Sequence, residues 1–292
     1  MHKSVLFNET LEYLCCEKKH IVLDATIGGA GHAIKILDRI TPGGKLIGID
    51  ADKLALENAR RVLSDYKKDF SLVNENYRDF DKVLADLGVV SVDAMLFDLG
   101  ISSFQLDEAA RGFSFLKEGP LDMRMDKEKG QPLWQALRKM SEADIGAIIR
   151  DLGEERYWRR IAKAIVAEYR ISPIKDTSRL ARIIRDVAKY RPGSRIDPAT
   201  RTFQAFRIFI NDELNALKEA LLKAPKFLNS GGRMVVISFH SLEDRIVKHT
   251  FKSMAKENLL RVMTKKPIRP SETEIADNPR SRSSKLRVVE KI

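Results

Sequence analysis

The sequence predicts an α/β fold, in which a doubly wound parallel sheet is interrupted by a helical insertion. Three observations support this prediction. Four apolar segments typical of buried strands alternate with helical patterns, at residues 20–28, 45–52, 70–77 and 92–100. From about Ser102 to Asn211 the pattern is helical, without a convincing strand. Strand patterns then return, at 231–240, 259–267 and 284–292.

Each element in the first half has a recognisable boundary. After the first strand, a helical face formed by Ala33, Ile36, Leu37 and Ile40 is stopped by Pro42-Gly43-Gly44. After the second strand, Asp52 is a good cap for a helix in which Leu56, Ala59 and Leu63 recur at helical spacing. We therefore expect an α/β domain formed by 1–105 and 215–292, with an all-helical insertion at 106–214.

The insertion contains five stretches with helical periodicity, at 132–140, 141–152, 155–170, 177–190 and 198–222. The segment 265–284, which follows the insertion, is rich in Pro, Ser and charged residues and reads as a loop.

The charge of the chain favours a polyanionic partner. Lys and Arg number 52 against 41 Asp and Glu, which gives a net charge of +11 over 292 residues. The segment from Arg156 to Asn211 holds 14 Lys and Arg against 4 Asp and Glu. Such an excess is typical of a surface that binds nucleic acid phosphates, although solvated helix faces are the alternative.

Several classes of protein are disfavoured. The two cysteines, Cys15 and Cys16, are adjacent, which predicts neither a disulfide scaffold nor a zinc site. The five histidines have no paired spacing, so we expect no metal. No apolar run reaches about 18 residues, and the first residues have no apolar signal segment. A cytoplasmic enzyme that does not enter a membrane is the expectation.

A glycine-rich turn follows the first strand, in the stretch LDATIGGAGHA at 23–33. A P-loop requires Gly-Lys-Ser/Thr at its end, and a dinucleotide fold requires G-x-G-x-x-G; neither is present. S-adenosylmethionine has no phosphate and carries an ammonium group, which a carboxylate at Asp24 complements. At His32 we expect the backbone N–H at the helix start to matter more than the ring.

Three further side chains lie at the ends of successive predicted strands, since Asp50 ends the second, Tyr77 ends the third and Asp98 lies at the end of the fourth. Asp50 can accept both ribose hydroxyls, which suits S-adenosylmethionine and NAD equally. Tyr77 can flank an adenine, and Asp98 would lie beside the methionine part of the cofactor. Amino-group methyltransferases often carry Asp/Asn/Ser-Pro-Pro-aromatic at this last position, whereas this chain has Asp98-Leu-Gly-Ile. Because the carboxyl ends of parallel strands share one edge, these residues predict a nucleoside-cofactor site.

Longer motifs make the prediction specific. Between residues 2 and 288 the chain contains HKSVLFNE, DATIGGAGH, FDLGISSFQLD, RGFSF, PLDMRM, TRTFQAFRIFINDEL, SFHSLEDRIVK and NPRSRSSKLRV. In these stretches it resembles the RsmH (MraW) family of bacterial methyltransferases. The resemblance implies a class I S-adenosylmethionine methyltransferase fold that methylates N4 of a cytidine in small-subunit ribosomal RNA, near the decoding centre. The implied cofactor residues are Ala30, Gly31, His32, Asp50, Tyr77, Asp98 and Gln105.

The resemblance makes the helical insertion the expected RNA-recognition domain, and an assembled or nearly assembled small subunit the expected partner. Asp98 is the candidate catalytic residue, because it can accept from the N4 amine; a contact with the cofactor alone is the alternative. Further candidates for RNA contacts are Arg111, Phe113, Phe115, Arg124, Arg201 and His240. Their alternatives are core packing for the two aromatics, ion pairs with Asp122 or Asp126 for the arginines, and a structural role for His240.

Three other functions compete with this one. An NAD-dependent oxidoreductase is disfavoured by the glycine spacing and by the basic insertion. A non-catalytic RNA-binding assembly factor is disfavoured because Asp24, Asp50 and Asp98 are all present. A methyltransferase acting on DNA amines is disfavoured by the absence of the two prolines after Asp98.

Overall fold

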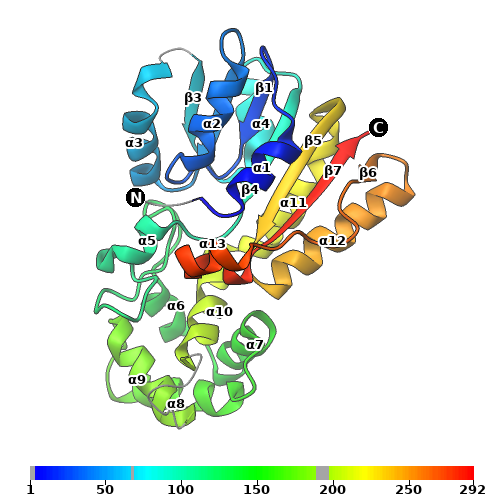
Figure 1. The fold of residues 1–292 in the computed structure, drawn as a ribbon. Coiled ribbons are helices and arrows are strands. Elements are labelled where there is room, and N and C mark those ends of the chain that lie inside the picture. Colours follow the sequence, from blue (N-terminus) through cyan, green and yellow to red (C-terminus); the bar gives the residue numbers. More distant parts are fainter. Residues whose placement is uncertain (1–3, 67–68, 189–196) are drawn as a thin grey trace. The chain divides into compact units, whose positions relative to one another are not determined.

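The computed structural model describes residues 4–66, 69–188 and 197–292, and its contacts divide the chain into two compact units (Figure 1). Unit 1 combines Met1–Gly100 with Leu214–Ile292, and unit 2 is the continuous segment Ile101–Glu213. Unit 1 is therefore assembled from both ends of the chain.

Unit 1 contains a seven-stranded sheet with the strand order β3-β2-β1-β4-β5-β7-β6. The first five strands of this order run parallel, and β7 is antiparallel to both of its neighbours. The α/β class and all the strands predicted from the sequence are confirmed. The strands are β1 (Ile21–Asp24), β2 (Lys45–Asp50), β3 (Phe70–Asn74), β4 (Val92–Asp98), β5 (Leu228–Ser238), β6 (Leu260–Val262) and β7 (Lys285–Lys291).

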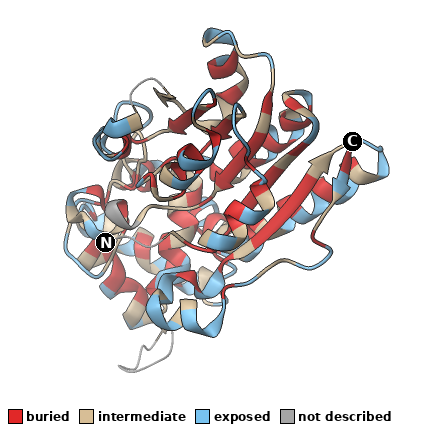
Figure 2. Cartoon of the chain, turned by 45° about the horizontal axis from the view of Figure 1, so that its top comes forward, coloured by how far each residue is buried: buried red, intermediate tan, exposed pale blue. Residues whose placement is uncertain are grey.

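Helices cover both faces of this sheet. They are α1 (Phe7–Leu14), α2 (Gly31–Ile40), α3 (Lys53–Val62), α4 (Phe80–Asp86), α11 (Glu213–Lys223) and α12 (Ser241–Lys256). A further short helix, α13 (Glu272–Asp277), has no buried residue. Because successive strand residues point to opposite faces, Leu23 and Phe97 pack with α4, α11 and α12, whereas Val22 and Leu46 pack with α1, α2 and α3. The central strands are accordingly buried along most of their length (Figure 2). A parallel sheet requires this double cover.

Unit 2 is built from helices around a core of its own, to which Ile149, Ile165 and Phe206 contribute. Its described residues contain no strand, only an isolated bridge between Pro120 and Asp176. None of the described helices of the chain is long and apolar enough to span a bilayer. The helices of unit 2 are α5 (Ser103–Asp107), α6 (Leu133–Lys139), α7 (Glu142–Gly153), α8 (Trp158–Ile171), α9 (Thr177–Ala188) and α10 (Ala199–Asn211).

Three local predictions were wrong. β3 ends at Asn74, so Tyr77 does not end a strand but begins a short 3-10 turn. The segment 265–284 is not only loop, because Ser271 caps α13 by accepting from the backbone N–H of Glu274. The helical stretch 198–222 is divided into α10 and α11 at Asp212, whose φ of 51° lies in the left-handed region. Residues 189–190 of the helix predicted at 177–190 lie outside the described residues.

Candidate cofactor-binding site

The glycine turn connects β1 to α2 in a strained backbone conformation. Gly28 and Ala30 have φ values of 46° and 61°, a region that glycine adopts easily and alanine rarely. Ala30 is the N-cap residue of α2, and no side chain caps this helix. A Cβ atom at Gly29 would meet nothing within 4 Å. The first backbone N–H groups of α2 can therefore be offered to a ligand.

The N-terminal segment of the chain lies against the start of α2. A Cβ atom on Gly31 would lie 2.0 Å from Oγ of Ser4, so the present approach of the two segments requires glycine. The backbone N–H of Leu6 donates to Oε1 of Glu274 at 2.8 Å, which ties the same segment to α13. The turn is thus enclosed by residues from both ends of the chain.

The ring of His32 is buried, with 5% of the residue exposed. Its Nε2 lies 3.3 Å from the carbonyl oxygen of Val5, and its ring stacks on Phe7 with centroids 5.7 Å apart. Because the carbonyl oxygen can only accept, Nε2 carries the hydrogen of this bond. The other nitrogen, Nδ1, lies 3.6 Å from Oδ2 of Asp98. The ring therefore has contacts of its own, which the sequence did not lead us to expect.

Asp50 ends β2 and fixes the geometry of the turn. Its Oδ2 accepts from the backbone N–H of Gly28 at 2.9 Å, and its Oδ1 accepts from that of Asp52 at 2.9 Å. Each carboxylate oxygen has a further acceptor site. The two oxygens can consequently accept two ligand hydroxyls while they hold the turn in place. Asp52 itself caps α3, as predicted, by accepting from the backbone N–H of Leu54 at 3.0 Å.

Buried acids gather at the carboxyl ends of β1 and β4. Asp24 is 2% exposed, and burial raises its pKa to about 7, although the N–H of Thr26 donates to it and lowers that pKa. The pKa of Asp98 lies well above its usual value because of burial, and then because of the charges of Asp24 and Glu243. Glu243 is 3% exposed. The charge of Asp50 also raises the pKa of Asp24, and buried acids that lie this close together are typical of a site for a cationic group.

Tyr77 lies beyond the end of β3, where its ring meets Phe97 edge-on with centroids 6.1 Å apart. The side chain of Asn76 orders this turn by accepting from the backbone N–H of Arg78 at 2.9 Å. The side chain of Asn74 donates to the backbone carbonyl of Asp50 at 2.9 Å, which joins the ends of β2 and β3. Tyr77 is thus positioned at the same edge of the sheet as Asp50, by a turn and not by the strand.

The groups at this edge fit S-adenosylmethionine. Oδ1 of Asp98 is buried and has no hydrogen-bond partner among the described residues, so a ligand donor would satisfy it. Asp50 would hold the ribose, Tyr77 the adenine, and the N–H groups after Ala30 the carboxylate. The positive ammonium and sulfonium would favour the ionised forms of Asp24 and Asp98, which then provide negative charge beside them. When bound, the cofactor supplies an electrophilic methyl group.

Replacing Asp24 by asparagine is expected to stabilise the cofactor-free protein at neutral pH. In the folded state Asp24 keeps its proton up to about pH 7, whereas in the unfolded chain it loses it near pH 4. The folded state therefore binds more protons in this window, and the free energy of unfolding falls as pH rises, by about 4 kcal/mol in total from this group. Thermal unfolding between pH 4 and 8 measures the difference between Asp24→Asn and the wild type.

The two proteins should unfold at similar temperatures near pH 4 and diverge as pH rises, with Asp24→Asn higher. Saturating S-adenosylmethionine should stabilise the wild type more than the variant, because the cofactor's cationic groups favour the ionised carboxylate. Parallel unfolding profiles across the pH range would contradict the assigned cause.

His240 follows β5 and is the N-cap residue of α12. Its Nδ1 accepts from the backbone N–H of Glu243 at 3.3 Å, while Oε2 of Glu243 accepts from the backbone N–H of His240 at 3.2 Å. The imidazole of His240 therefore fills the cap position of this helix. Its Nε2 lies 3.1 Å from Oε1 of Glu243. His240 thus has a structural role as a helix cap, and a contact between His240 and RNA stays a prediction.

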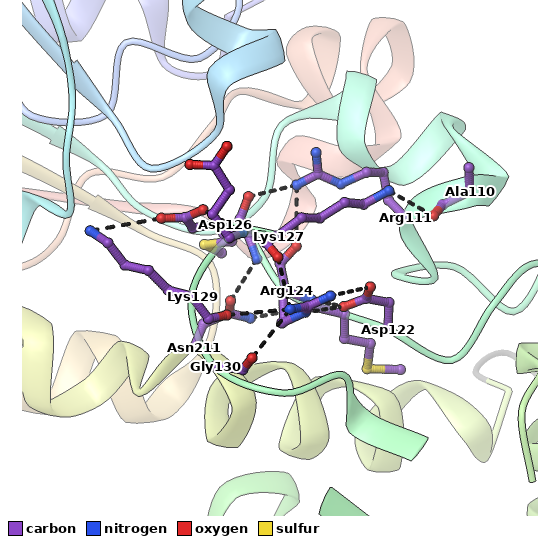
Figure 3. Close-up of polar contacts among 12 residues, drawn as sticks. Ala110, Arg111, Asp122, Arg124, Asp126, Lys127, Lys129, Gly130 and Asn211 are labelled. Atoms are coloured by element: carbon purple, nitrogen blue, oxygen red, sulfur yellow. Dashed lines mark hydrogen bonds and ion pairs between the residues drawn. The ribbon is translucent and has the colours of Figure 1, made fainter. Parts of the chain in front are cut away.

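Two of the candidate RNA-binding arginines hold a loop of unit 2 together (Figure 3). Nη2 of Arg111 donates to the carbonyl oxygens of Arg124 and Met125, at 3.2 and 2.7 Å. Arg124 forms a bidentate pair with Asp122, with distances of 2.7 and 3.0 Å. Asn211 joins this loop to α10 by accepting from the N–H of Met125 at 2.7 Å. Arg124 therefore forms the ion pair with Asp122 that was the predicted alternative to an RNA contact.

The remaining candidates of unit 2 differ in exposure. Phe113 is 6% exposed within the core, and Phe115 packs edge-on against Phe203. Arg201 is exposed and donates to the carbonyl oxygen of Glu154 at 3.2 Å. Gln105 is 5% exposed, and its Oε1 accepts from the backbone N–H of Ser102 at 3.0 Å. Arg201 is thus the most accessible of these side chains.

Sequence reasoning missed three residues of the site in unit 1. Thr26 occupies a position where glycine is common, and its Oγ1 accepts from the backbone N–H of Asp98 at 2.7 Å, joining the ends of β1 and β4. Glu243 lies on α12, and its charge raises the pKa of Asp98 on the distant strand β4. Phe7 stacks on His32, and no local pattern signals a contact between segments so far apart. Of these three residues, only Thr26 could have been found from the sequence, because its hydroxyl lies next to the glycine-rich turn.

Comparison with known proteins identifies the family. The model of the MraW methylase family matches residues 1–292. The ribosomal RNA small subunit methyltransferase H of Syntrophus aciditrophicus is 46% identical, with 100% of this chain and 98% of that protein covered. The proteins of the same name from Geotalea uraniireducens and Thermotoga neapolitana are 45% and 47% identical, with 100% and 99% of this chain and 98% and 95% of those proteins covered.

A solved structure agrees on the fold. A Clostridium thermocellum protein proposed to be an rRNA methylase aligns over 100% of both chains, with a TM-score of 0.51 and 14% sequence identity. This likeness concerns the fold alone. The family match and the identities of the relatives lead to one conclusion: the chain belongs to the MraW methylase family and is an S-adenosylmethionine-dependent methyltransferase of the class I fold.

Proposed function

We propose that this methyltransferase transfers a methyl group to N4 of a cytidine in small-subunit ribosomal RNA. The names of the relatives support the RNA substrate. The observation that supports an amine as acceptor is Oδ1 of Asp98, a buried oxygen without a hydrogen-bond partner among the described residues. An exocyclic amine has N–H groups that can donate a hydrogen bond to this oxygen, whereas a ring carbon has no such donor.

The cofactor site that we assign is the set implied by the family resemblance. Asp50 binds the ribose and Tyr77 flanks the adenine. The turn from Ala30 to His32 holds the amino-acid part of the cofactor. The family resemblance also implies Gln105, a residue of unit 2. The assigned residues are Ala30, Gly31, His32, Asp50, Tyr77, Asp98 and Gln105.

Asp98 orients the acceptor amine in this proposal. The lone pair of the cytosine amine is delocalised into the ring, so the amine is a weak nucleophile. Methyl transfer to it is an in-line displacement that depends mainly on positioning and on electrostatic stabilisation. An acceptor that holds one N–H of the amine fixes the direction of its nitrogen. A stacked cytosine must first leave its stack to reach such a position.

Unit 2 is the proposed RNA-recognition domain, with Arg111, Phe113, Arg124, Arg201 and, from unit 1, His240 as candidate contacts. The proposed partner is an assembled or nearly assembled small ribosomal subunit in the cytoplasm, and the proposed target lies near the decoding centre. The charge excess between Arg156 and Asn211 supports the assignment of unit 2 to RNA.

Methyl transfer to small subunits that lack this modification tests the proposal. The purified protein is incubated with methyl-labelled S-adenosylmethionine and with free ribosomal RNA, precursor particles or mature subunits. The RNA is then digested to nucleosides and analysed by chromatography and mass spectrometry. We expect labelled N4-methylcytidine, with most incorporation into the assembled particles.

Three outcomes would contradict the proposal. Label found only as 5-methylcytidine would exclude the amine as acceptor. No incorporation at any assembly stage would favour a non-catalytic assembly factor. An increase in unfolding temperature with NAD, and none with S-adenosylmethionine, would favour the oxidoreductase alternative.

A further inference from the structure

Helix α8 begins with two aromatic and three arginine side chains that pack on one another. We call Arg156, Tyr157, Trp158, Arg159 and Arg160 the α8 arginine cluster. The guanidinium carbons of Arg156 and Arg160 lie 4.5 and 6.0 Å from the ring centroid of Tyr157, and that of Arg159 lies 4.8 Å from the ring of Trp158. The three arginines are exposed and the two rings are half-buried.

Acids do not neutralise this cluster. Elsewhere in unit 2, ion pairs join Arg179 to Glu168, Arg185 to Asp197, and Arg207 to Glu213. Over the described residues, by contrast, no carboxylate comes within ion-pair distance of the three cluster arginines. Some of the arginines of unit 2 are thus neutralised by ion pairs within the unit, whereas the arginines at the start of α8 can bind a negatively charged partner.

The cluster also lies at the unfavourable end of its helix. A helix N-terminus is electropositive, so its first turn usually carries acids. The preceding helix, α7, follows this rule with Ser141 and Asp144 in a capping box. The first turn of α8 has no acid and no side-chain cap. Arg159 and Arg160 stand in this first turn, where their charges add to the positive end of the helix.

We propose that the α8 arginine cluster binds phosphates of the RNA substrate, an inference that rests on the proposed function. A guanidinium group can donate two parallel hydrogen bonds to the oxygens of one phosphate. Stacking on Tyr157 and Trp158 orders the arginine side chains before the RNA binds. The electropositive start of α8 adds to the attraction for phosphate. Contacts to phosphates position the RNA backbone and carry no sequence information.

The double variant Arg159→Ala/Arg160→Ala tests this inference. Binding of wild-type and variant protein to small ribosomal subunits is measured by filter binding over a range of salt concentrations. We expect an affinity loss of roughly 10- to 100-fold and a salt dependence reduced by about 1.5 to 2 in logarithmic slope. The KM for subunits should rise, whereas kcat and the Kd for S-adenosylmethionine should stay unchanged. Circular dichroism confirms folding.

Two controls separate the cluster from general charge. Arg150 stacks on the same Trp158 ring, at 5.3 Å, but its guanidinium forms a bidentate pair with Asp151 at 2.6 and 2.8 Å. Arg150→Ala should therefore change RNA affinity little. Arg60→Ala/Arg61→Ala removes two exposed charges from α3 and should also have little effect. Arg159→Lys/Arg160→Lys should keep the salt slope and lose part of the affinity.

The outcomes distinguish the inference from the proposed function. Wild-type affinity and salt slope in Arg159→Ala/Arg160→Ala would overturn the inference while the enzyme still methylates RNA. An equal loss in Arg60→Ala/Arg61→Ala would also overturn it, because general charge would then explain the binding. If the wild type methylates no ribosomal RNA but the cluster variant still loses RNA affinity, the inference stands and the proposed function fails.

Discussion

Replacing Asp98 by asparagine is expected to lower kcat for methyl transfer by about 100-fold or more, the range for one electrostatic or proton-accepting group. The buried Oδ1 of Asp98 has no partner among the described residues, and its Oδ2 lies 3.6 Å from Nδ1 of His32. Asparagine keeps the size of the side chain but loses its negative charge. Single-turnover rates at saturating cofactor and RNA measure this loss separately from binding.

The cofactor Kd decides between the two roles of Asp98. A large loss of kcat with a small change in Kd indicates contact with the amine, whereas a raised Kd with normal kcat indicates contact with the cofactor alone. Asp93→Asn is the matched control, because Asp93 lies at the other end of β4, where it accepts from the backbone N–H of Ile21 at 2.8 Å. Full turnover and normal cofactor affinity in Asp98→Asn would exclude both roles.

Replacing Asp50 by alanine is expected to weaken S-adenosylmethionine binding by roughly 100- to 1000-fold, since two hydrogen bonds to a charged group contribute about 3 to 4 kcal/mol. Asp50 also accepts from the backbone N–H groups of Gly28 and Asp52, so its loss loosens the turn. Isothermal titration calorimetry with S-adenosylmethionine and with its 2′-deoxy analogue separates these effects. The analogue should bind more weakly than the cofactor to the wild type and about equally to Asp50→Ala.

Asp52→Asn is the control for this prediction. Asp52 is buried two residues away and caps α3, and asparagine caps helices about as well as aspartate. This variant should bind the cofactor normally. If the analogue loses as much affinity for Asp50→Ala as for the wild type, Asp50 does not bind the ribose.

The sheet was predictable because each strand is marked by the residues within and directly beside it. The strands around Val22 and Ile47 are short apolar runs between turn residues, and burial on both faces requires such runs. Asp50 was predictable for the same reason, since it directly follows a run of this kind. The regular alternation of strands and helices then fixed the α/β class.

The rest of the site depends on contacts between distant segments. Tyr77 was predicted to end the third strand, and this was wrong, because β3 ends at Asn74 and the turn that Asn76 orders holds Tyr77 beyond it. The stacking of Phe7 on His32 joins two elements without any shared pattern. The pKa values of Asp24 and Asp98 arise from burial and from mutual charge, neither of which a sequence displays.

The position of β7 has a consequence for biosynthesis. β7 is formed by Lys285–Lys291 and lies between β5 and β6 in the sheet. Until these last residues leave the ribosome, the apolar strand β5 has an unpaired edge, which is prone to pair with other chains. The hydrogen bond from the backbone N–H of Leu6 to Glu274 also cannot form until the segment that contains Glu274 has been synthesised. The nascent chain can thus complete unit 2 before β7, and the cofactor turn is enclosed only after the segment around Glu274 has been synthesised.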